Sequence, residues 1–254
     1  VAQIGPTGLV AGSIAAQLLG VGALAKRVRE NDKKEFEKVS VASIIYNAKL
    51  YFKYPVYSAF GALVNNAGTQ APIFIITKFF NTNITGMFSL CQRVLTLPMG
   101  ILASSISQVL FQKISEMNNN EPEKLFGFIV SFFMKLVIIT IPFVLVSAVW
   151  GGDIFVFILG DKWYQAGEFT VLVSLVVAVR FAVSPLSYVL LLDQNIKLGV
   201  YWQMVYCASV ITTLLLARNL DIDSFLKVFV VHEFLLYGLH LAIILYASKY
   251  RVKT

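Results

Sequence analysis

Residues 125–150 read LFGFIVSFFMKLVIITIPFVLVSAVW, and this stretch decides the class of fold. Its only charged residue is Lys135. A helix needs about 20 apolar residues to cross the hydrocarbon core of a bilayer, and this stretch is longer than that. Strands of a membrane barrel alternate apolar and polar side chains, whereas this stretch shows no such alternation. We therefore predict a membrane-spanning helix.

Apolar segments of similar length occur on both sides of this stretch. We predict seven spanning helices in all, which gives an all-α, polytopic transmembrane helix bundle. The predicted spans are 6–25, 55–77, 84–111, 125–150, 167–191, 198–217 and 225–247.

The composition agrees with a membrane protein. Of 254 residues, 57% are hydrophobic and 14% are charged, whereas soluble domains carry about 25% charged residues. The mean hydropathy is +0.74. These values exclude an ordinary soluble enzyme, a nucleic-acid-binding domain and a disordered chain. Both cysteines lie in apolar runs, which supports neither a disulfide framework nor a zinc site.

The basic residues predict an orientation. Cytoplasmic loops of membrane proteins are enriched in Lys and Arg. One set of predicted loops carries 14 Lys and Arg residues and the other carries 3. This bias predicts that the 26–54 loop and the C-terminus are cytoplasmic. The chain opens on Val1 with an apolar stretch and no charged leader, so we expect a fragment whose N-terminal part is missing.

Two segments between the predicted spans have patterns of their own. Val39–Phe52 places apolar residues at helical spacing, which predicts an amphipathic helix on the inner membrane surface. The alternative is a plain solvated linker. Residues 151–166 are expected to form the longest outer loop, with Trp163 and Tyr164 at the membrane interface.

Three basic residues are predicted to lie near the middle of the membrane: Arg93, Lys135 and Arg180. Ionisable side chains are costly there and mark functional sites by default. We expect the three cations to face a water-filled cavity that receives an anion. The alternative is that each one bonds backbone carbonyls or a carboxylate elsewhere in the protein.

Four amides also lie in predicted spans: Asn65, Asn66, Gln70 and Gln92. Such residues either hydrogen-bond a neighbouring helix or contact substrate. We also expect Pro98 to kink its helix.

The last predicted span carries Glu233 and His240, which are seven residues apart and share a helix face. A carboxylate and a histidine placed in this way could transfer protons. The alternative is a structural glutamate paired with a Lys or Arg of another helix. We find no phosphate-binding loop, metalloprotease motif or nucleophile elbow, so we expect no enzyme activity, no cofactor and no metal.

One region resembles a known family. Residues 75–98 read IITKFFNTNITGMFSLCQRVLTLP, an apolar span, a short turn and then an arginine followed by a proline. This resembles oligosaccharide flippases of the Wzx type, in the multidrug/oligosaccharidyl-lipid/polysaccharide exporter superfamily. The segments around Arg180 with 184–187 (SPLS), 193–195 (DQN) and 160–163 (GDKW) are similar to the family as well.

The resemblance implies a two-lobe transporter. Residues 1–27 would then be the helix that ends a truncated N-terminal lobe, 28–54 a cytoplasmic linker, and 55–254 the C-terminal six-helix lobe. The implied function is to flip a lipid-linked oligosaccharide, carried on undecaprenyl pyrophosphate, across the bacterial inner membrane by alternating access. Arg93, Arg180 and Lys135 would bind the diphosphate, and the four amides would bind sugar hydroxyls.

The implied partners are membrane lipid, a coupling proton or sodium ion and other polysaccharide-assembly proteins, and we expect no nucleic acid. The alternatives are a multidrug exporter of the same superfamily, a membrane-embedded enzyme, and a structural partner in polysaccharide assembly.

Overall fold

The computed structural model describes residues 5–31, 40–192 and 195–249, and every regular element in these ranges is a helix. This confirms the predicted all-α class. The chain divides into two compact units, Val1–Pro55 and Val56–Thr254, each described here by itself.

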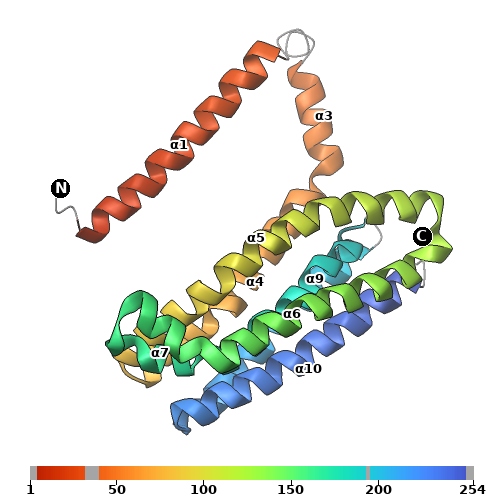
Figure 1. The fold of residues 1–254 in the computed structure, drawn as a ribbon. Coiled ribbons are helices and arrows are strands. Elements are labelled where there is room, and N and C mark those ends of the chain that lie inside the picture. The colour runs from red at the N-terminus through yellow and green to blue at the C-terminus, as the bar shows by residue number, and fades with distance from the viewer. Residues whose placement is uncertain (1–4, 32–39, 193–194, 250–254) are drawn as a thin grey trace. The chain divides into compact units, whose positions relative to one another are not determined.

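The first unit contains α1 (Gly5–Asn31) and α3 (Val41–Tyr51) (Figure 1). The side chain of Ser40 caps α3 by accepting a hydrogen bond from the backbone N–H of Ser43 at 3.1 Å. No residue of α3 is buried. The helix predicted within Val39–Phe52 is therefore present, and its position on a membrane surface stays a prediction. Residues 32–39, which include the first residue of that prediction, Val39, lie outside the described ranges.

The second unit is built from long helices joined by short turns (Figure 1). Side chains cap two of them, because Asn81 accepts a hydrogen bond from the N–H of Ile84 and Asp221 accepts one from the N–H of Ser224. The helices are α4 (Lys53–Phe79, which begins in the first unit), α5 (Thr82–Asn120), α6 (Pro122–Leu159), α8 (Thr170–Val183), α9 (Ile196–Leu216) and α10 (Ile222–Lys249), with the 3₁₀ segment η2 (Ser184–Leu191) after α8.

Five helical segments in the described ranges are long and apolar enough to cross a membrane. They are Thr82–Asn120, Pro122–Leu159, Thr170–Leu191, Lys197–Asn219 and Ile222–Lys249, which correspond to the last five predicted spans. The first two predicted spans are also helical, as α1 and α4, but they are not among the five. For α4, the amides Asn65, Asn66 and Gln70 lower the hydropathy of the segment.

The predicted outer loop at 151–166 is wrong over its first half. Helix α6 continues without interruption to Leu159 because the residues after Asp153 are apolar and contain no proline. It ends at Gly160, whose φ of 92° suits glycine. Two short elements follow, η1 (Asp161–Trp163) and α7 (Tyr164–Glu168). Helix α5 continues through Pro98, and the predicted kink at this residue stays a prediction.

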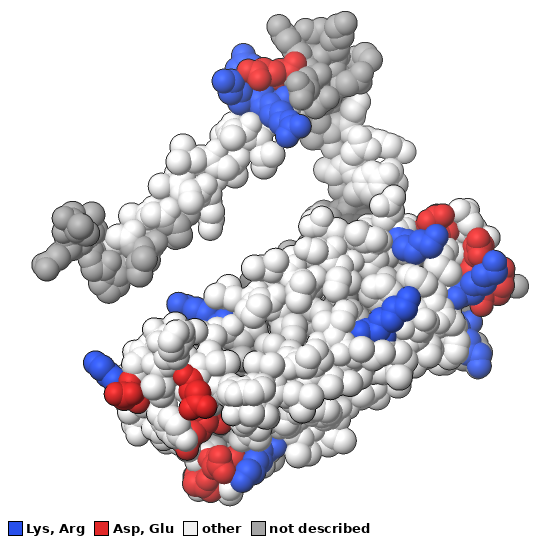
Figure 2. All heavy atoms as spheres, in the orientation of Figure 1, with Lys and Arg blue, Asp and Glu red and all other residues white. Residues whose placement is uncertain are grey.

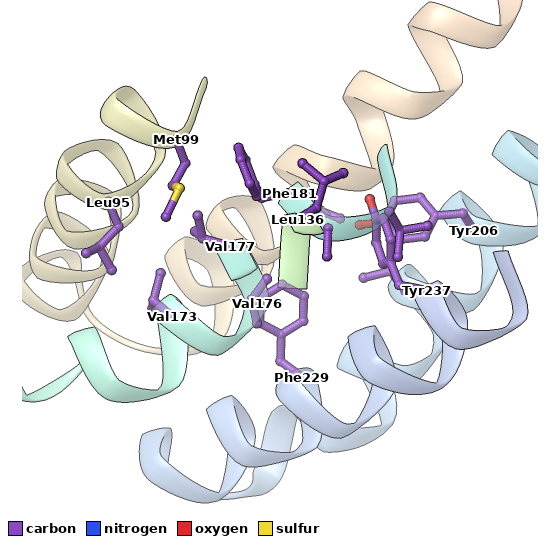
Figure 3. Packing of buried hydrophobic residues seen from close by; sticks show 14 of the residues in the cluster. Leu95, Met99, Leu136, Val173, Val176, Val177, Phe181, Tyr206, Phe229 and Tyr237 are labelled. Atoms are coloured by element: carbon purple, nitrogen blue, oxygen red, sulfur yellow. The ribbon is translucent and has the colours of Figure 1, made fainter. Parts of the chain in front are cut away.

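Helix α8 lies at the centre of the second unit. The most apolar stretch of Thr170–Leu191, the segment that comprises α8 and η2, is 61% buried within the chain, compared with 17% for the corresponding stretches of α5 and α6. The close packing of α7, the short helix just before α8, against α6 depends on glycine, because a Cβ on Gly167 would lie 2.4 Å from the Cα of Gly152. The core in Figure 3 joins α8 to α5, α6, α9 and α10 through Val173, Val176, Val177 and Phe181 with Leu95, Met99, Leu136, Tyr206, Phe229 and Tyr237.

Charged side chains are unevenly distributed over the second unit. On the face in Figure 2 they gather towards the two ends of the helix bundle, and the surface between them is mostly uncharged. The second unit also carries many exposed large apolar side chains, including Ile138, Val149 and Leu235. Such a distribution fits helices surrounded by lipid, because a bilayer presents an apolar middle and polar borders.

Candidate functional site

Three adjoining cavities open in the second unit, between α4, α5 and the helices that follow them. The first, here the Trp202 cavity, has a volume of about 510 Å³ and includes Ser58, Asn65, Ser107, Trp202, Gln203 and His240. The second, the middle cavity, has about 430 Å³ and includes Asn66, Phe88, Val177, Phe181 and Phe229. The third, the Arg93 cavity, has about 670 Å³ and includes Ser89, Arg93, Ile101 and Ser104.

Neighbouring cavities share walls. Thr69, Ala103, Arg180 and Ser184 line both the Trp202 cavity and the middle cavity. Gln70, Gln92, Thr96 and Gly100 line both the middle cavity and the Arg93 cavity. The three cavities therefore lie next to one another along the helices that carry most of the predicted site residues, and together they are called the hollow here.

Arg180 belongs to a hydrogen-bonded cluster that joins three helices. Its Nε donates to Glu233 Oε2 at 2.7 Å, and its Nη2 donates to the hydroxyl of Tyr206 at 2.8 Å. The Tyr206 hydroxyl in turn donates to Glu233 Oε1 at 3.1 Å. The side chain of Glu233 is fully buried and that of Arg180 is 18% exposed. The guanidinium charge is thus neutralised by a carboxylate beside it.

Two further residues, His232 and Phe229, extend this cluster. His232 places its Nδ1 3.5 Å from Glu233 Oε1 and its Nε2 3.2 Å from Ser209 Oγ. The guanidinium of Arg180 also lies over the ring of Phe229, 5.7 Å from the ring centroid. These contacts hold side chains of α8, α9 and α10 in one arrangement, and Arg180 forms the wall between two of the cavities.

Arg93 has a different environment. Its side chain is exposed, and it has no hydrogen-bond or ion-pair partner among the residues that the structure describes. Ser89, Thr96 and Ser104 lie on the same side of α5 and line the same cavity. None of the described residues that line the three cavities is Asp or Glu. The positive charge of Arg93 is therefore available to an anion.

A second polar group of the hollow lies in the Trp202 cavity. Asn65 of α4 donates a hydrogen bond to Gln203 Oε1 of α9 at 2.5 Å. His240, only 4% exposed, stacks on Trp202 with ring centroids 4.3 Å apart and an angle of 14° between the rings. Both ring nitrogens of His240 lack a hydrogen-bond partner within the described part of the chain. Buried polar atoms usually have partners, so this histidine requires an explanation.

The structure brings most of the predicted site residues into the hollow. Asn65, Arg180 and His240 line the Trp202 cavity, while Asn66, Gln70, Gln92 and Arg180 line the middle cavity. Gln70, Gln92 and Arg93 line the Arg93 cavity. Glu233 forms an ion pair with Arg180, which is the alternative considered above, a glutamate paired with a Lys or Arg of another helix. Lys135 differs, because its exposed side chain on α6 lines none of these cavities.

Sequence reasoning missed three residues of the hollow and its wall: Trp202, Gln203 and Tyr206. Gln203 carried a usable signal, since it is an amide in an apolar span like Asn65. Trp202 and Tyr206 are ordinary residues in such a span, and only the packing of α9 against its neighbours shows that they contact His240 and Arg180.

Comparison with known proteins gives the family. Residues 2–168 match the profile of the family described as "Polysaccharide biosynthesis protein", which is more than half of the chain. One relative is the teichuronic acid biosynthesis protein TuaB of Bacillus subtilis (strain 168), which is 23% identical over 155 residues. These residues are 61% of this chain and 32% of the relative, so the match spans about a third of that protein. No solved structure matches the chain.

The family match includes α5 and Arg93 and ends before α8, where Arg180 lies. Because the match covers most of the chain and the structure contains several helices able to cross a membrane, this is a multi-pass membrane protein that belongs to the polysaccharide biosynthesis protein family.

Proposed function

We propose that this chain is part of a flippase that moves a lipid-linked oligosaccharide from the cytoplasmic to the outer leaflet of the bacterial inner membrane. The substrate would be carried on undecaprenyl pyrophosphate, and the chain would move it by alternating access without making or breaking a covalent bond. The Wzx-type resemblance suggested this activity, and the geometry of the hollow supports it.

The observation that carries the proposal is Arg93, which has no partner among the described residues and lies in a hollow that also carries hydroxyl and amide side chains. A diphosphate needs cations to cross apolar surroundings, and the planar guanidinium of arginine binds phosphate oxygens in pairs. Serine, threonine and amide side chains line the same hollow and match the hydroxyl groups of sugars. Charge and hydrogen-bonding groups thus fit both parts of the proposed substrate.

The same hollow argues against export of cationic drugs. A cation would need a carboxylate to bind in the membrane, but no described residue of the cavity walls is acidic. Glu233, the buried carboxylate nearby, is already paired with Arg180 at 2.7 Å. We therefore place the multidrug alternative second.

Further parts of the proposal concern orientation and coupling. We propose that the C-terminus and the 26–54 segment are cytoplasmic, as the distribution of Lys and Arg predicts. A proton or sodium gradient would drive the return of the empty carrier, and other polysaccharide-assembly proteins would supply and remove the substrate. Glu233 and His240 were predicted to serve that coupling.

The test is complementation in a bacterial strain that lacks its own polysaccharide flippase. The gene that encodes this sequence is expressed, and surface polysaccharide is measured together with the lipid-linked intermediate on the cytoplasmic side. We expect restored polysaccharide and a depleted intermediate. We expect both effects to disappear in Arg93→Ala, because that variant removes the free cation of the hollow.

Lys135→Ala is the matched control, since it removes one positive charge from a spanning helix but from outside the cavities. Membrane abundance of each variant is measured alongside. Equal losses of transport in Arg93→Ala and Lys135→Ala at equal abundance would contradict the proposed role of Arg93. Formation of a new covalent product from lipid-linked sugar by purified protein would show an enzyme instead.

A further inference from the structure

The Trp202 cavity and the Arg93 cavity differ in the groups they offer to a ligand. Arg93 lies among hydroxyl side chains and has no partner in the described part of the chain. Among the described residues that line the Trp202 cavity, the only Lys or Arg is Arg180, and that residue already has Glu233 as its partner. A doubly charged diphosphate is therefore attracted to the Arg93 cavity more than to the Trp202 cavity.

The groups of the Trp202 cavity suit a neutral, hydroxyl-bearing ring. The linked amides of Asn65 and Gln203 leave further donor and acceptor positions, since each amide has two N–H groups and an oxygen with two lone pairs. Tyr57, Tyr188 and Trp202 supply aromatic rings to the same wall. Aromatic surface for the ring faces and amides for the hydroxyls together fit a sugar.

His240 provides a second observation at this cavity. It is 4% exposed, it lines the cavity, and neither ring nitrogen has a hydrogen-bond partner within the described residues. Its neighbours Trp202 and Tyr237 contact it through ring faces and edges, at centroid distances of 4.3 and 5.9 Å. A ligand hydroxyl can both donate and accept, so it would satisfy an imidazole nitrogen in either tautomer.

We infer that the hollow has two subsites, with the diphosphate bound at Arg93 and a distal sugar of the oligosaccharide bound in the Trp202 cavity by Gln203, His240 and the aromatic wall. This inference rests on the proposed function, and it divides the proposed binding site into a part that binds the charged diphosphate and a part that binds a neutral sugar. It assigns His240 to substrate recognition and Arg180 to the wall between the subsites.

The spacing of the two subsites adds a length requirement. On α5, Ala103 is the residue of the Trp202 cavity nearest to Arg93, and 10 residues of helix separate the two, which corresponds to roughly 15 Å at 1.5 Å per residue. A single sugar on the diphosphate cannot extend that far, whereas a chain of several sugars can. The Trp202 cavity would thus recognise oligosaccharides and ignore short intermediates.

The test measures the Kd of the full-length protein in lipid nanodiscs for three probes. They are undecaprenyl pyrophosphate without sugar, the same carrier with one sugar, and the carrier with the complete oligosaccharide extracted from the source bacterium. For wild-type protein we expect the complete substrate to bind more tightly than the other two, because it alone occupies both subsites.

Two variants address the sugar subsite. His240→Phe keeps an aromatic ring against Trp202 and removes the ring nitrogens, and Gln203→Met keeps the side-chain length and removes the amide. We expect each to weaken binding of the complete substrate by about 3- to 10-fold, the usual effect of one lost hydrogen bond, and to leave the bare carrier within about 2-fold. The Tm of His240→Phe should not fall, because no existing hydrogen bond is lost.

Arg93→Gln addresses the other subsite, and we expect it to weaken binding of all three probes by about 10-fold or more. The inference is overturned if His240→Phe and Gln203→Met leave all three Kd values unchanged or raise them equally. It is also overturned if the one-sugar probe binds as tightly as the complete substrate. A role of His240 in ion coupling would leave every Kd unchanged and alter only gradient-driven transport.

The failure of the proposed function has a separate signature. If wild-type protein binds none of the probes, or if Arg93→Gln changes no Kd, the carrier is not the ligand. If Arg93→Gln weakens every probe but the sugar-subsite variants do not discriminate among them, the proposed function stands and the two-subsite inference fails.

Discussion

Arg180 and Arg93 were predicted to do the same work, yet their surroundings in the folded chain are opposite. Arg180 lies in a closed cluster with Tyr206 and Glu233, where each side chain bonds the other two. Arg93 faces a cavity and has no ion-pair partner in the described ranges. Of these two cations, one is thus paired within the fold, and the other has no partner in the described part of the chain.

The difference shows what an intramembrane charge does and does not indicate. A charge inside a bilayer must be compensated, but the compensating group can belong to the fold or to a ligand. When the fold supplies it, as Glu233 does for Arg180, the expected consequence of mutation is loss of stability. When the fold does not supply it, as for Arg93, the expected consequence is loss of binding.

The largest expected effect comes from breaking the Arg180 cluster. Glu233→Ala would leave the guanidinium of Arg180 in a mostly buried site without its carboxylate. Removing one partner of a buried ion pair typically costs about 3–5 kcal/mol. We expect a large fall in the Tm and in the membrane abundance of the variant.

The matched control is the double variant Arg180→Gln/Glu233→Gln, which removes both charges and keeps groups able to hydrogen-bond. Replacing both partners of a buried pair is much less harmful than removing one. We therefore expect a Tm well above that of Glu233→Ala. A double variant as unstable as the single one would contradict the structural role assigned to the pair.

The next prediction compares two glycines, Gly68 beside the Arg180 cluster and Gly100 in the wall of the Arg93 cavity. A Cβ on Gly68 would lie 2.9 Å from the ring of Tyr206, whereas a Cβ on Gly100 would have no atom within 4 Å. Gly68→Ala should lower the free energy of unfolding by about 1–3 kcal/mol through overpacking. Gly100→Ala should leave it unchanged or raise it slightly, because alanine favours helix. Equal Tm values for the two variants would count against this packing of α4 on α9.

A smaller effect is expected from Tyr206→Phe. The substitution keeps the ring and removes the hydroxyl that bonds Arg180 at 2.8 Å and Glu233 at 3.1 Å. Because the direct Arg180–Glu233 bond remains, we expect a loss of about 1–2 kcal/mol in the free energy of unfolding. Thermal denaturation of purified protein measures it, and a loss as large as that of Glu233→Ala would mean that the hydroxyl is the main link of the cluster.

The smallest effect on stability is expected at Arg93. Arg93→Gln removes a side chain with no partner in the described structure, so the free energy of unfolding should change by no more than about 0.5 kcal/mol. Lys135→Gln, on the exposed surface of α6, should behave in the same way. The two variants should separate only in transport, which Arg93→Gln abolishes and Lys135→Gln preserves. A fall in Tm for Arg93→Gln alone would make Arg93 a structural residue.

Much of the fold could be predicted because a membrane-spanning helix requires a long apolar segment, which can be recognised in the sequence. The segment 125–150 and the helix at Val39–Phe52 were expected, and α6 and α3 lie there. Helix ends were predicted less well, as the continuation of α6 to Leu159 shows. An apolar segment that extends beyond the bilayer reads like any other apolar segment, and only the φ of 92° at Gly160 fixes where the helix stops.

The sequence predicted which residue types form the site, but it did not predict which cation is paired with a carboxylate. Arg93, Lys135 and Arg180 were chosen for the same reason, the free-energy cost of a charged side chain inside the bilayer. In the sequence this cost is judged from charge and depth alone. Whether a carboxylate lies beside a cation depends on which helices meet, and Arg180 and Glu233 are 53 residues apart in the sequence. The stacking of His240 on Trp202 is equally a product of tertiary packing.

The length of α5 and α6 also determines where the protein can be reached from outside the membrane. With 39 and 38 residues, each helix measures roughly 57–59 Å, nearly twice the hydrocarbon thickness of about 30 Å. A hairpin of this length leaves its tip, at Asn119, in aqueous solution on one side. After replacement of Cys91 and Cys207, a single cysteine at that tip would react with an impermeant maleimide from that side only. One labelling reaction would thus establish the sidedness of the bundle, and the distribution of Lys and Arg predicts the cytoplasmic side.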